Sequence, residues 1–145
     1  MVYEVYDVEG TRKIALDFAK KLNSGDVVCM YGDLGAGKTE FVRQMAHTLG
    51  IKDYITSPTF TIVNEYKGDI DLYHFDVYRI DDSDEMYEIG YEEYIDGDGI
   101  CVIEWAQLIE DILPPKRYSV TINTDYSKGE GYRKITIISP NDMED

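Results

Sequence analysis

Hydrophobic positions in the first fifty residues follow two different spacings. Beyond residue 10, apolar residues recur every four positions, as on one face of a helix. At 27–31 they form a near-continuous run, as in a strand covered on both faces. The elements predicted here are a strand at 2–6, a helix containing Ile14, Phe18 and Leu22, a strand at 27–31, and a helix from Phe41 to Leu49 that ends at Gly50. Strands that alternate with helices indicate a parallel core sheet.

The rest of the chain predicts hairpins and short helices. Two alternating segments, 59–66 and 70–78, are joined by Lys67-Gly68-Asp69, which indicates an antiparallel pair. The other predicted elements are short helices on both sides of Gly90, a strand from Ile100 to Glu104, a short helix that ends at Pro114, and a hairpin that pairs 118–123 with 134–139. We therefore expect one small α/β domain over 1–145, with three layers, a mixed and partly parallel sheet, antiparallel hairpins at its margins, and a frayed tail at 140–145.

The charge of the chain limits the partners that it can bind. Its 145 residues include 29 acidic and 14 basic ones, a net charge of −15. Affinity for nucleic acids comes largely from Lys and Arg that neutralise phosphates, so direct, tight nucleic-acid binding is not expected. A protein partner with a basic surface fits better. Nine of the 18 residues at 81–98 are acidic and none is basic, and this run either faces such a partner or is a solvated surface.

Hydropathy and cysteine spacing indicate the compartment. No apolar stretch approaches the roughly 18 residues that a membrane span needs, and residues 1–7 lack the basic flank and apolar core of a signal peptide. We therefore expect a cytoplasmic protein without membrane contact. Cys29 and Cys101 lie inside predicted strands, without CxxC or metal-ligand spacing, and are expected to be reduced core residues.

One segment carries the pattern of a phosphate-binding loop. Residues 32–39, GDLGAGKT, fit G-x-x-x-x-G-K-[ST] completely, after a predicted strand and before a predicted helix. In such a P-loop, glycines let successive N–H groups point at phosphate oxygens, and the helix adds its positive N-terminal end. Lys38 is expected to bridge the β- and γ-phosphates, and the Thr39 hydroxyl to ligate magnesium. The predicted nucleotide-binding residues are Asp33, Leu34, Gly35, Ala36, Gly37, Lys38 and Thr39, in a P-loop NTPase-like domain.

A P-loop also needs an acid at the end of a neighbouring apolar strand, where it holds or positions the metal. Glu104 ends the run at 100–104 and is the stronger candidate, while Asp76 in LYHFDVYR is the second. An acid at a strand end is otherwise a helix cap or an ion-pair partner. The sequence leaves open whether Glu104 or Asp76 positions the attacking water.

Four blocks, in this order and spacing, resemble the TsaE (YjeE) family: GDLGAGKT, SPTF at 57–60, HFDVYR at 74–79 and IEW at 103–105. This family consists of small bacterial ATPases of tRNA threonylcarbamoyladenosine biosynthesis, and the resemblance runs from about residue 9 to residue 124. It implies ATP as ligand, Mg2+ near Thr39, Asp76 and Glu104, and catalytic roles for Glu104, Asp76 and Lys38. It also implies binding to the TsaD–TsaB complex, which transfers a threonylcarbamoyl group to an adenosine of tRNA.

The resemblance extends to two threonines. Thr59 belongs to a nucleotide-sensing loop that starts at Ser57, and its hydroxyl is expected to reach toward the γ-phosphate or the metal; the alternative is a simple strand-start residue. Thr11 matches a threonine of the family near the nucleotide base, or is a plain residue of the first helix. Glu40 stands where the family commonly has a second threonine, and its carboxylate is expected to point sideways into solvent.

Four other side chains near these motifs have open roles. Arg79 and Arg43 either stabilise charge on the transferred phosphate or pair with acids. Trp105 either packs beside Glu104 or contributes to a partner interface. His74 is either a hydrogen-bonded structural residue or a base.

These patterns support three hypotheses about function. The first is an ATPase whose hydrolysis drives the cycle of another protein. The second is a small-molecule or nucleoside kinase, although the chain has no Arg-rich lid segment and little sequence left for an acceptor pocket. The third is a nucleotide-gated binding module without useful turnover.

Overall fold

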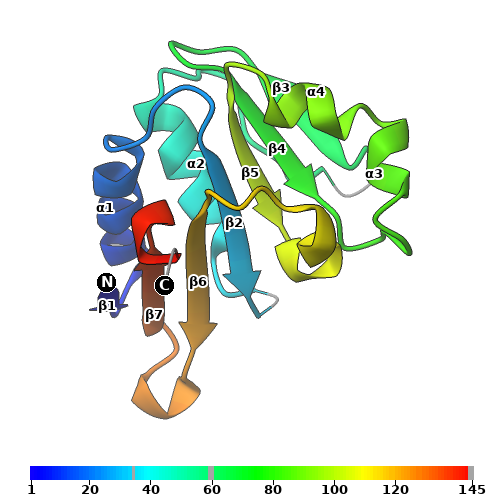
Figure 1. Ribbon diagram of the computed structural model, residues 1–145. Coiled ribbons are helices and arrows are strands. Elements are labelled where there is room, and N and C mark those ends of the chain that lie inside the picture. The colour runs from blue at the N-terminus through cyan, green and yellow to red at the C-terminus, as the bar shows by residue number, and fades with distance from the viewer. Residues whose placement is uncertain (34, 59–60, 144–145) are drawn as a thin grey trace.

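The computed structural model describes residues 1–33, 35–58 and 61–143, within which a seven-stranded sheet has the order β1-β7-β6-β2-β5-β4-β3 (Figure 1). The strands are β1 (Val2–Val5), β2 (Val27–Gly32), β3 (Val63–Tyr66), β4 (Leu72–Asp76), β5 (Ile100–Glu104), β6 (Tyr118–Thr124) and β7 (Arg133–Ile138). The α-helices are α1 (Val8–Ala19), α2 (Lys38–Thr48), α3 (Glu85–Glu88) and α4 (Tyr91–Ile95). Three 3-10 helices follow, η1 (Ala106–Ile112), η2 (Tyr126–Lys128) and η3 (Pro140–Met143).

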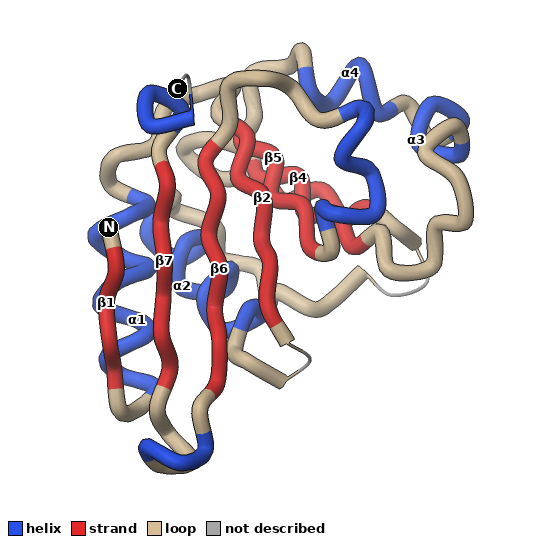
Figure 2. The backbone as a smooth tube through the Cα atoms, turned by 60° about the horizontal axis from the view of Figure 1, so that its bottom comes forward, coloured by secondary structure: helices blue, strands red, loops and turns tan. Residues whose placement is uncertain are grey.

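The strands lie side by side in one sheet (Figure 2), with parallel strands at its centre and antiparallel pairs at its margins. β2 pairs in parallel with β5 on one side and with β6 on the other, and β4 pairs in parallel with β5. At one margin β3 pairs antiparallel with β4, and at the other β6, β7 and β1 form antiparallel pairs. Both predicted hairpins and the predicted mixed sheet are therefore confirmed.

Helices cover both faces of the sheet, as the three-layer prediction requires (Figure 1). α1 and α2 bury Phe18 and Phe41 against one face, whereas α3, α4 and η1 bury residues such as Met86 against the other. Cys29 and Met30, successive residues of β2, belong to opposite clusters, because side chains alternate along a strand. The central strand is thus buried on both faces, which explains its near-continuous apolar sequence.

The end of the chain differs from the expected frayed tail. Pro140–Met143 form the 3-10 turn η3. The amide and the hydroxyl of Ser139 both donate to the Asp142 carboxylate, at 3.3 and 2.9 Å. A side chain that accepts hydrogen bonds from the residues before it stabilises a short turn locally, which a hydropathy pattern does not reveal. Residues 144 and 145 lie outside the described part of the chain.

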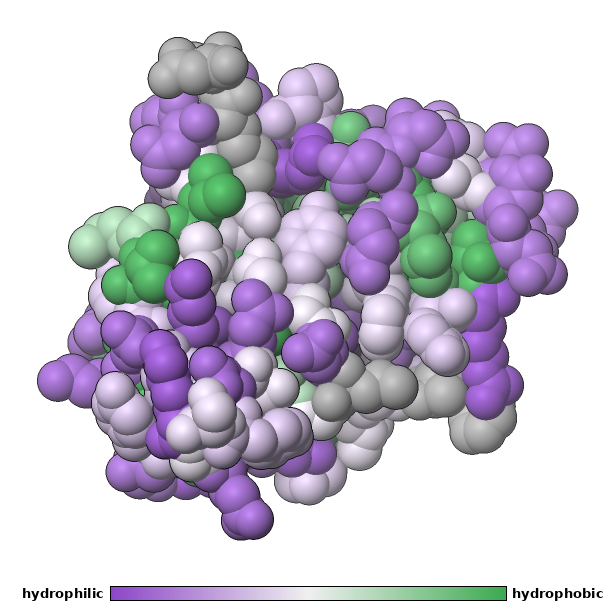
Figure 3. All heavy atoms as spheres, turned by 90° about the horizontal axis from the view of Figure 1, so that it is seen from below, coloured by the Kyte–Doolittle hydropathy of each residue, from purple (hydrophilic) through white to green (hydrophobic). Residues whose placement is uncertain are grey.

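The parallel arrangement determines where polar side chains meet. β2, β5 and β4 all end at the same edge, where Glu104 is the register partner of both Met30 and Asp76. Figure 3 shows this end of the molecule, with residues of intermediate hydropathy in the middle of the face and both hydrophilic and hydrophobic residues around them. None of the described helices is both long and apolar enough to cross a lipid bilayer.

Candidate nucleotide-binding site

The loop between β2 and α2 depends on glycine for two different reasons. Gly32 has a φ of 132°, and a Cβ built there would lie 2.0 Å from the carbonyl oxygen of Ile122 on β6. Gly37 has a φ of 101°, but a Cβ there would meet no atom within 4 Å among the described residues. Gly32 therefore lets the chain pass close to β6. At Gly37 the reason is the left-handed backbone alone, because its Cα faces open space at the start of α2.

The N-terminus of α2 is open toward this space. Gly37 is its N-cap residue and makes no side-chain hydrogen bond to the first turn. The first amides of a helix have no partner within the helix, and together with the helix dipole they attract anions. The free amides and the dipole at the start of this 11-residue helix therefore fit a phosphate group.

Lys38 places its ammonium group among acidic side chains. Its Nζ donates to the Gly32 carbonyl at 2.9 Å and lies 4.1 Å from the centre of the Trp105 ring. Burial lowers the pKa of Lys38, while the charges of Glu104, Asp76 and Asp33 act in the opposite direction. The side chain is only 6% exposed. A phosphate oxygen can take the place of the Gly32 carbonyl as the acceptor for the Lys38 ammonium.

The two candidate acids have different surroundings. Glu104 is buried, and its Oε2 lies 2.6 Å from Nε2 of His74, which is also buried. Asp76 is more exposed, and its Oδ2 accepts a hydrogen bond from the Ser57 hydroxyl at 3.1 Å. The structure therefore shows His74 as a hydrogen-bonded partner of Glu104. Because an ionised carboxylate can only accept, Nε2 of His74 donates to it in that state.

One cavity of about 290 Å³ brings most of the predicted site together. It is lined by Gly35, Gly37, Lys38, Thr39, Glu40, Ser57, Asp76, Glu104 and Trp105. The phosphate-binding loop, the threonine predicted to ligate magnesium and both candidate acids thus border one space. The predicted residues Leu34 and Thr59 lie outside the described part of the chain. Asp33 is exposed and does not line the cavity.

A smaller cavity of about 70 Å³ lies on the other side of the loop. Thr11, which is buried, lines it together with Ala36, Gly37 and Arg133. Because Gly37 and Glu40 line both cavities, the two adjoin at the first turn of α2. Thr11 therefore lies beside the loop, and its place near a nucleotide base stays a prediction.

Arg133 is a residue of this region that sequence analysis missed. Its Nε donates to the carbonyl of Ala36 at 2.8 Å, and its Nη1 donates to the carbonyls of Glu130 and Tyr132 at 2.9 and 2.7 Å. The guanidinium thus joins β7 to the loop, across 97 positions of sequence. Arg133 stands in no motif, so no local signal in one sequence points to it.

The expectation that Glu40 points into solvent is wrong. Its carboxylate pairs with Arg43 at 2.8 Å and with Arg12 of α1 at 3.5 Å. Both cations lie within reach because Arg43 is one helical turn away and α1 packs beside α2. Glu40 still lines both cavities, where its charge is opposed by these two cations.

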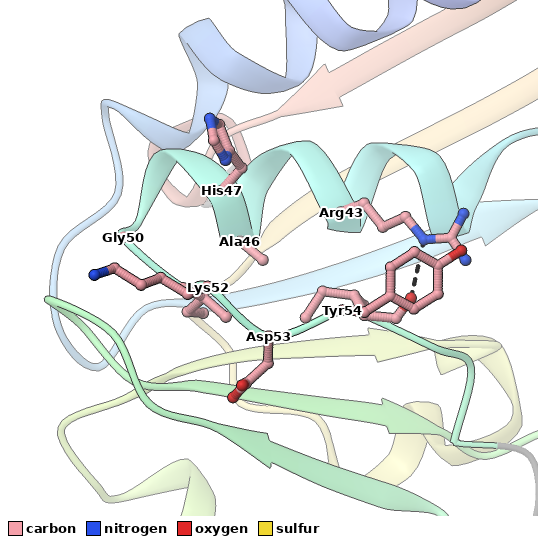
Figure 4. A pocket seen from close by; sticks show the side chains of 9 residues that line it. Arg43, Ala46, His47, Gly50, Lys52, Asp53 and Tyr54 are labelled. Atoms are coloured by element: carbon pink, nitrogen blue, oxygen red, sulfur yellow. Dashed lines mark hydrogen bonds between the residues drawn. The ribbon is translucent and has the colours of Figure 1, made fainter.

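Arg43 acts as a structural cation in a groove away from the loop (Figure 4). Besides pairing with Glu40, it donates from Nε to the Ile55 carbonyl at 2.9 Å and lies 4.7 Å from the centre of the Tyr54 ring. The groove, about 580 Å³ between α2 and residues 50–55, is larger than the cavity at the loop. It contains none of the predicted nucleotide- or metal-binding residues, most of which line the smaller cavity.

Trp105 has an unusual backbone conformation beside Glu104. Its φ is 63°, a left-handed value that is costly for a residue with a side chain. Its ring lies over Lys38 and 4.8 Å from the ring of Tyr78. Trp105 therefore packs, as one of its two expected roles required, and it also lines the cavity. Arg79 is exposed and does not line it.

A sequence model of one family, described as threonylcarbamoyl adenosine biosynthesis protein TsaE, matches residues 5–135. The chain belongs to the TsaE family. The match begins within β1 and ends in β7, so it includes the loop, both acids and Arg133. It extends beyond both ends of the stretch from about residue 9 to residue 124 that carries the four motifs.

Known relatives support the same family. The chain is 46% identical over 129 residues to the tRNA threonylcarbamoyladenosine biosynthesis protein TsaE of Bacillus subtilis, covering 88% of this chain and 78% of that protein. It is 45% identical over 116 residues to the protein of the same name from Treponema pallidum, covering 80% and 84%. A crystal structure of Bacillus subtilis YdiB matches with a TM-score of 0.81 and 38% identity, covering 96% of this chain and 84% of that one. Both the family and the P-loop NTPase-like fold are therefore established.

Proposed function

We propose that this protein is a Mg2+-dependent ATPase of the cytoplasm that supports tRNA threonylcarbamoyladenosine modification by acting on the TsaD–TsaB complex. The relatives named above carry the biosynthesis of this nucleoside in their names. The observation that carries the ATPase part is the cavity in which the open N-terminus of α2, Lys38 and two carboxylates face one another. Such a cavity combines groups that bind a polyphosphate with groups that position a metal and a water molecule.

Binding of the nucleotide follows from the two adjoining cavities. The amides at the start of α2 and the Lys38 ammonium would hold the β- and γ-phosphates, and the nucleoside would extend toward Thr11 and Arg133. Magnesium, held through Thr39 and Asp76, would neutralise charge on the phosphates. The carboxylate of Asp76 is already oriented by the Ser57 hydroxyl.

Hydrolysis needs a water molecule in line with the bond between the β- and γ-phosphates. We assign its orientation to Glu104, since His74 fixes one of its oxygens and leaves the other available. The water oxygen bonds to the γ-phosphorus as the bond to the bridging oxygen breaks, and ADP leaves. Glu104 accepts the proton of the water. Acids in this position typically contribute about 10² to 10⁴-fold in rate.

ATP turnover measured with and without purified TsaD–TsaB complex tests this proposal. We expect release of inorganic phosphate that requires Mg2+ and that the complex accelerates. Glu104→Gln should reduce hydrolysis at least about hundredfold while ATP affinity stays within a few-fold. Asp76→Asn should instead raise the Mg2+ concentration needed for half-maximal rate. Hydrolysis that the complex leaves unchanged, or phosphate transfer to a small-molecule acceptor in its place, would contradict the proposal.

A further inference from the structure

An exposed aromatic patch borders the candidate nucleotide site. Tyr78 is 55% exposed and Leu108 is 43% exposed, so both side chains present apolar surface to the solvent. The Tyr78 ring contacts the Trp105 ring, and the amide of Leu108 donates to the Trp105 carbonyl at 3.0 Å. Tyr78 thus packs on the ring of a residue that lines the cavity, and Leu108 follows that residue by one turn of η1. We call Tyr78, Trp105 and Leu108 the Trp105 patch.

The Trp105 patch is connected to the phosphate-binding lysine through one ring. The Lys38 ammonium lies over one part of Trp105, while Tyr78 packs 4.8 Å from its centre. When Lys38 turns toward a phosphate, the ring loses the cation that it contacts here. A bound nucleotide therefore changes the surroundings of Trp105 without any movement of a whole element.

Backbone strain at Trp105 supports a functional role for this arrangement. Among the described residues, only Ile62 and Trp105 have a positive φ without being glycine. Such conformations persist where the surrounding structure enforces them, and they concentrate at binding and switch regions. With this backbone conformation, the indole of Trp105 contacts Lys38 and is also partly exposed at the surface.

The two segments that carry the Trp105 patch are rich in acidic residues. The segments 78–85 and 105–113 contain six acidic residues and one basic residue, Arg79. The Ser83 hydroxyl donates to the Asp111 carboxylate at 2.5 Å, which joins the two segments into one surface. Aromatic centres with a charged rim are typical of protein–protein interfaces.

We propose that the Trp105 patch is the docking surface of a protein partner that presents an apolar side chain flanked by Lys or Arg. The acidic rim favours a basic partner, and the net charge of −15 opposes a second copy of this chain. Because Trp105 contacts Lys38, the partner senses whether a phosphate is bound. This inference rests on the proposed function, since it takes the TsaD–TsaB complex as the partner to test.

Binding of the TsaD–TsaB complex to wild type, Tyr78→Ala and Leu108→Ala, with ATP and with ADP, tests this surface. We expect each substitution to weaken binding about tenfold to hundredfold, as for residues central to an interface. Leu108→Ala should keep the basal ATP hydrolysis of the wild type. Binding should also weaken as salt rises from about 50 to 300 mM, since the rim charges are exposed.

Two matched variants provide the control. Tyr126→Ala and Ile138→Ala remove exposed apolar side chains, 68% and 37% exposed, at the far β6–β7 side of the sheet, and should bind like wild type. If wild type binds the complex and the patch variants bind equally well, the patch is refuted while the proposed function stands. If wild type does not bind the complex with either nucleotide, the proposed function fails. Self-association of the wild type that Leu108→Ala abolishes would identify a second copy as the occupant and overturn the inference.

Discussion

Nε2 of His74 lies 2.6 Å from Oε2 of Glu104, and neither side chain is more than 5% exposed. The two residues stand on adjacent parallel strands, β4 and β5, in which Val102 is the register partner of His74. A carboxylate held this way has one oxygen fixed inside the protein. Glu104 also lines the cavity at the phosphate-binding loop.

Removing the imidazole should therefore reduce turnover and stability together. In His74→Ala the buried Glu104 carboxylate loses its partner, and we expect a loss of about 3 kcal/mol in the free energy of unfolding. ATP hydrolysis should fall at least about tenfold, while ATP affinity stays within a few-fold. His74→Gln, which can donate from the same position, should recover part of the hydrolysis rate.

His47 provides the matched control for this experiment. It is the other histidine of the chain and is exposed on α2, so His47→Ala should leave turnover and unfolding unchanged. Denaturant unfolding and phosphate release would be measured on all three variants. A His74→Ala protein that is destabilised but hydrolyses ATP at the wild-type rate would show that the pair serves only the fold.

Lys38→Ala should abolish tight ATP binding without unfolding the domain. The ammonium contacts a carbonyl and an aromatic face, and alanine retains the helix while removing the charge from the cavity. We expect ATP affinity to fall at least about hundredfold, the range that a lost charge-assisted contact and its neighbours give. Equilibrium binding of labelled ATP measures the loss. Lys13→Ala, at an exposed position of α1, is the control, and unchanged ATP affinity in Lys38→Ala would refute the role assigned to the ammonium.

Arg133 should be more important for binding ATP than for hydrolysing it. Its guanidinium holds the Ala36 carbonyl of the loop together with two carbonyls next to β7. Since a lysine offers no planar fork of donors, Arg133→Lys should behave like Arg133→Ala, with ATP affinity about tenfold weaker and maximal turnover nearly retained. The adjacent, exposed Lys134→Ala is the control. Equal losses in affinity and maximal turnover would place Arg133 in the chemical step instead.

The buried thiols should be inert in the folded protein. Burial raises the pKa of Cys29 and of Cys101, each to about 12. A thiol whose pKa is raised by folding binds its proton more tightly in the native state. The free energy of unfolding is therefore independent of these thiols below about pH 8.5 and decreases as pH rises above it. Alkylation at pH 8 should be suppressed more than about thousandfold until the chain unfolds. Labelling at the same rate in native protein and in denaturant would place the thiols at the surface.

Most of the candidate site could be predicted because its residues lie in short segments whose neighbours determine their geometry. Gly32 to Thr39 form a contiguous motif, and parallel strands bring their terminal acids to one edge whatever the rest of the fold. The sequence therefore predicts which side chains face the cavity. It does not predict the hydrogen bond between His74 and Glu104, because that depends on the register of β4 against β5.

What could not be predicted depends on contacts between distant parts of the chain. Glu40 pairs with Arg12, 28 positions earlier, as well as with its helical neighbour Arg43, and the loop is supported by Arg133, 97 positions later. The left-handed backbone of Trp105 has no local signal either, because propensity rules assign that conformation to glycine. A single sequence contains no information on such pairs beyond its periodicity.

The position of β2 between β5 and β6 has a consequence for the order of folding. The strand that leads into the phosphate-binding loop comes early in the chain, but its two neighbours are the fifth and sixth strands of seven. On the ribosome, β2 has neither neighbour until β5 has emerged at Glu104, and its other side stays unpaired until β6 has emerged at Thr124. Such long-range pairing is slow. A nascent chain that stops before Tyr118 thus exposes a strongly apolar strand edge, and this stage of synthesis is where aggregation or chaperone binding is expected.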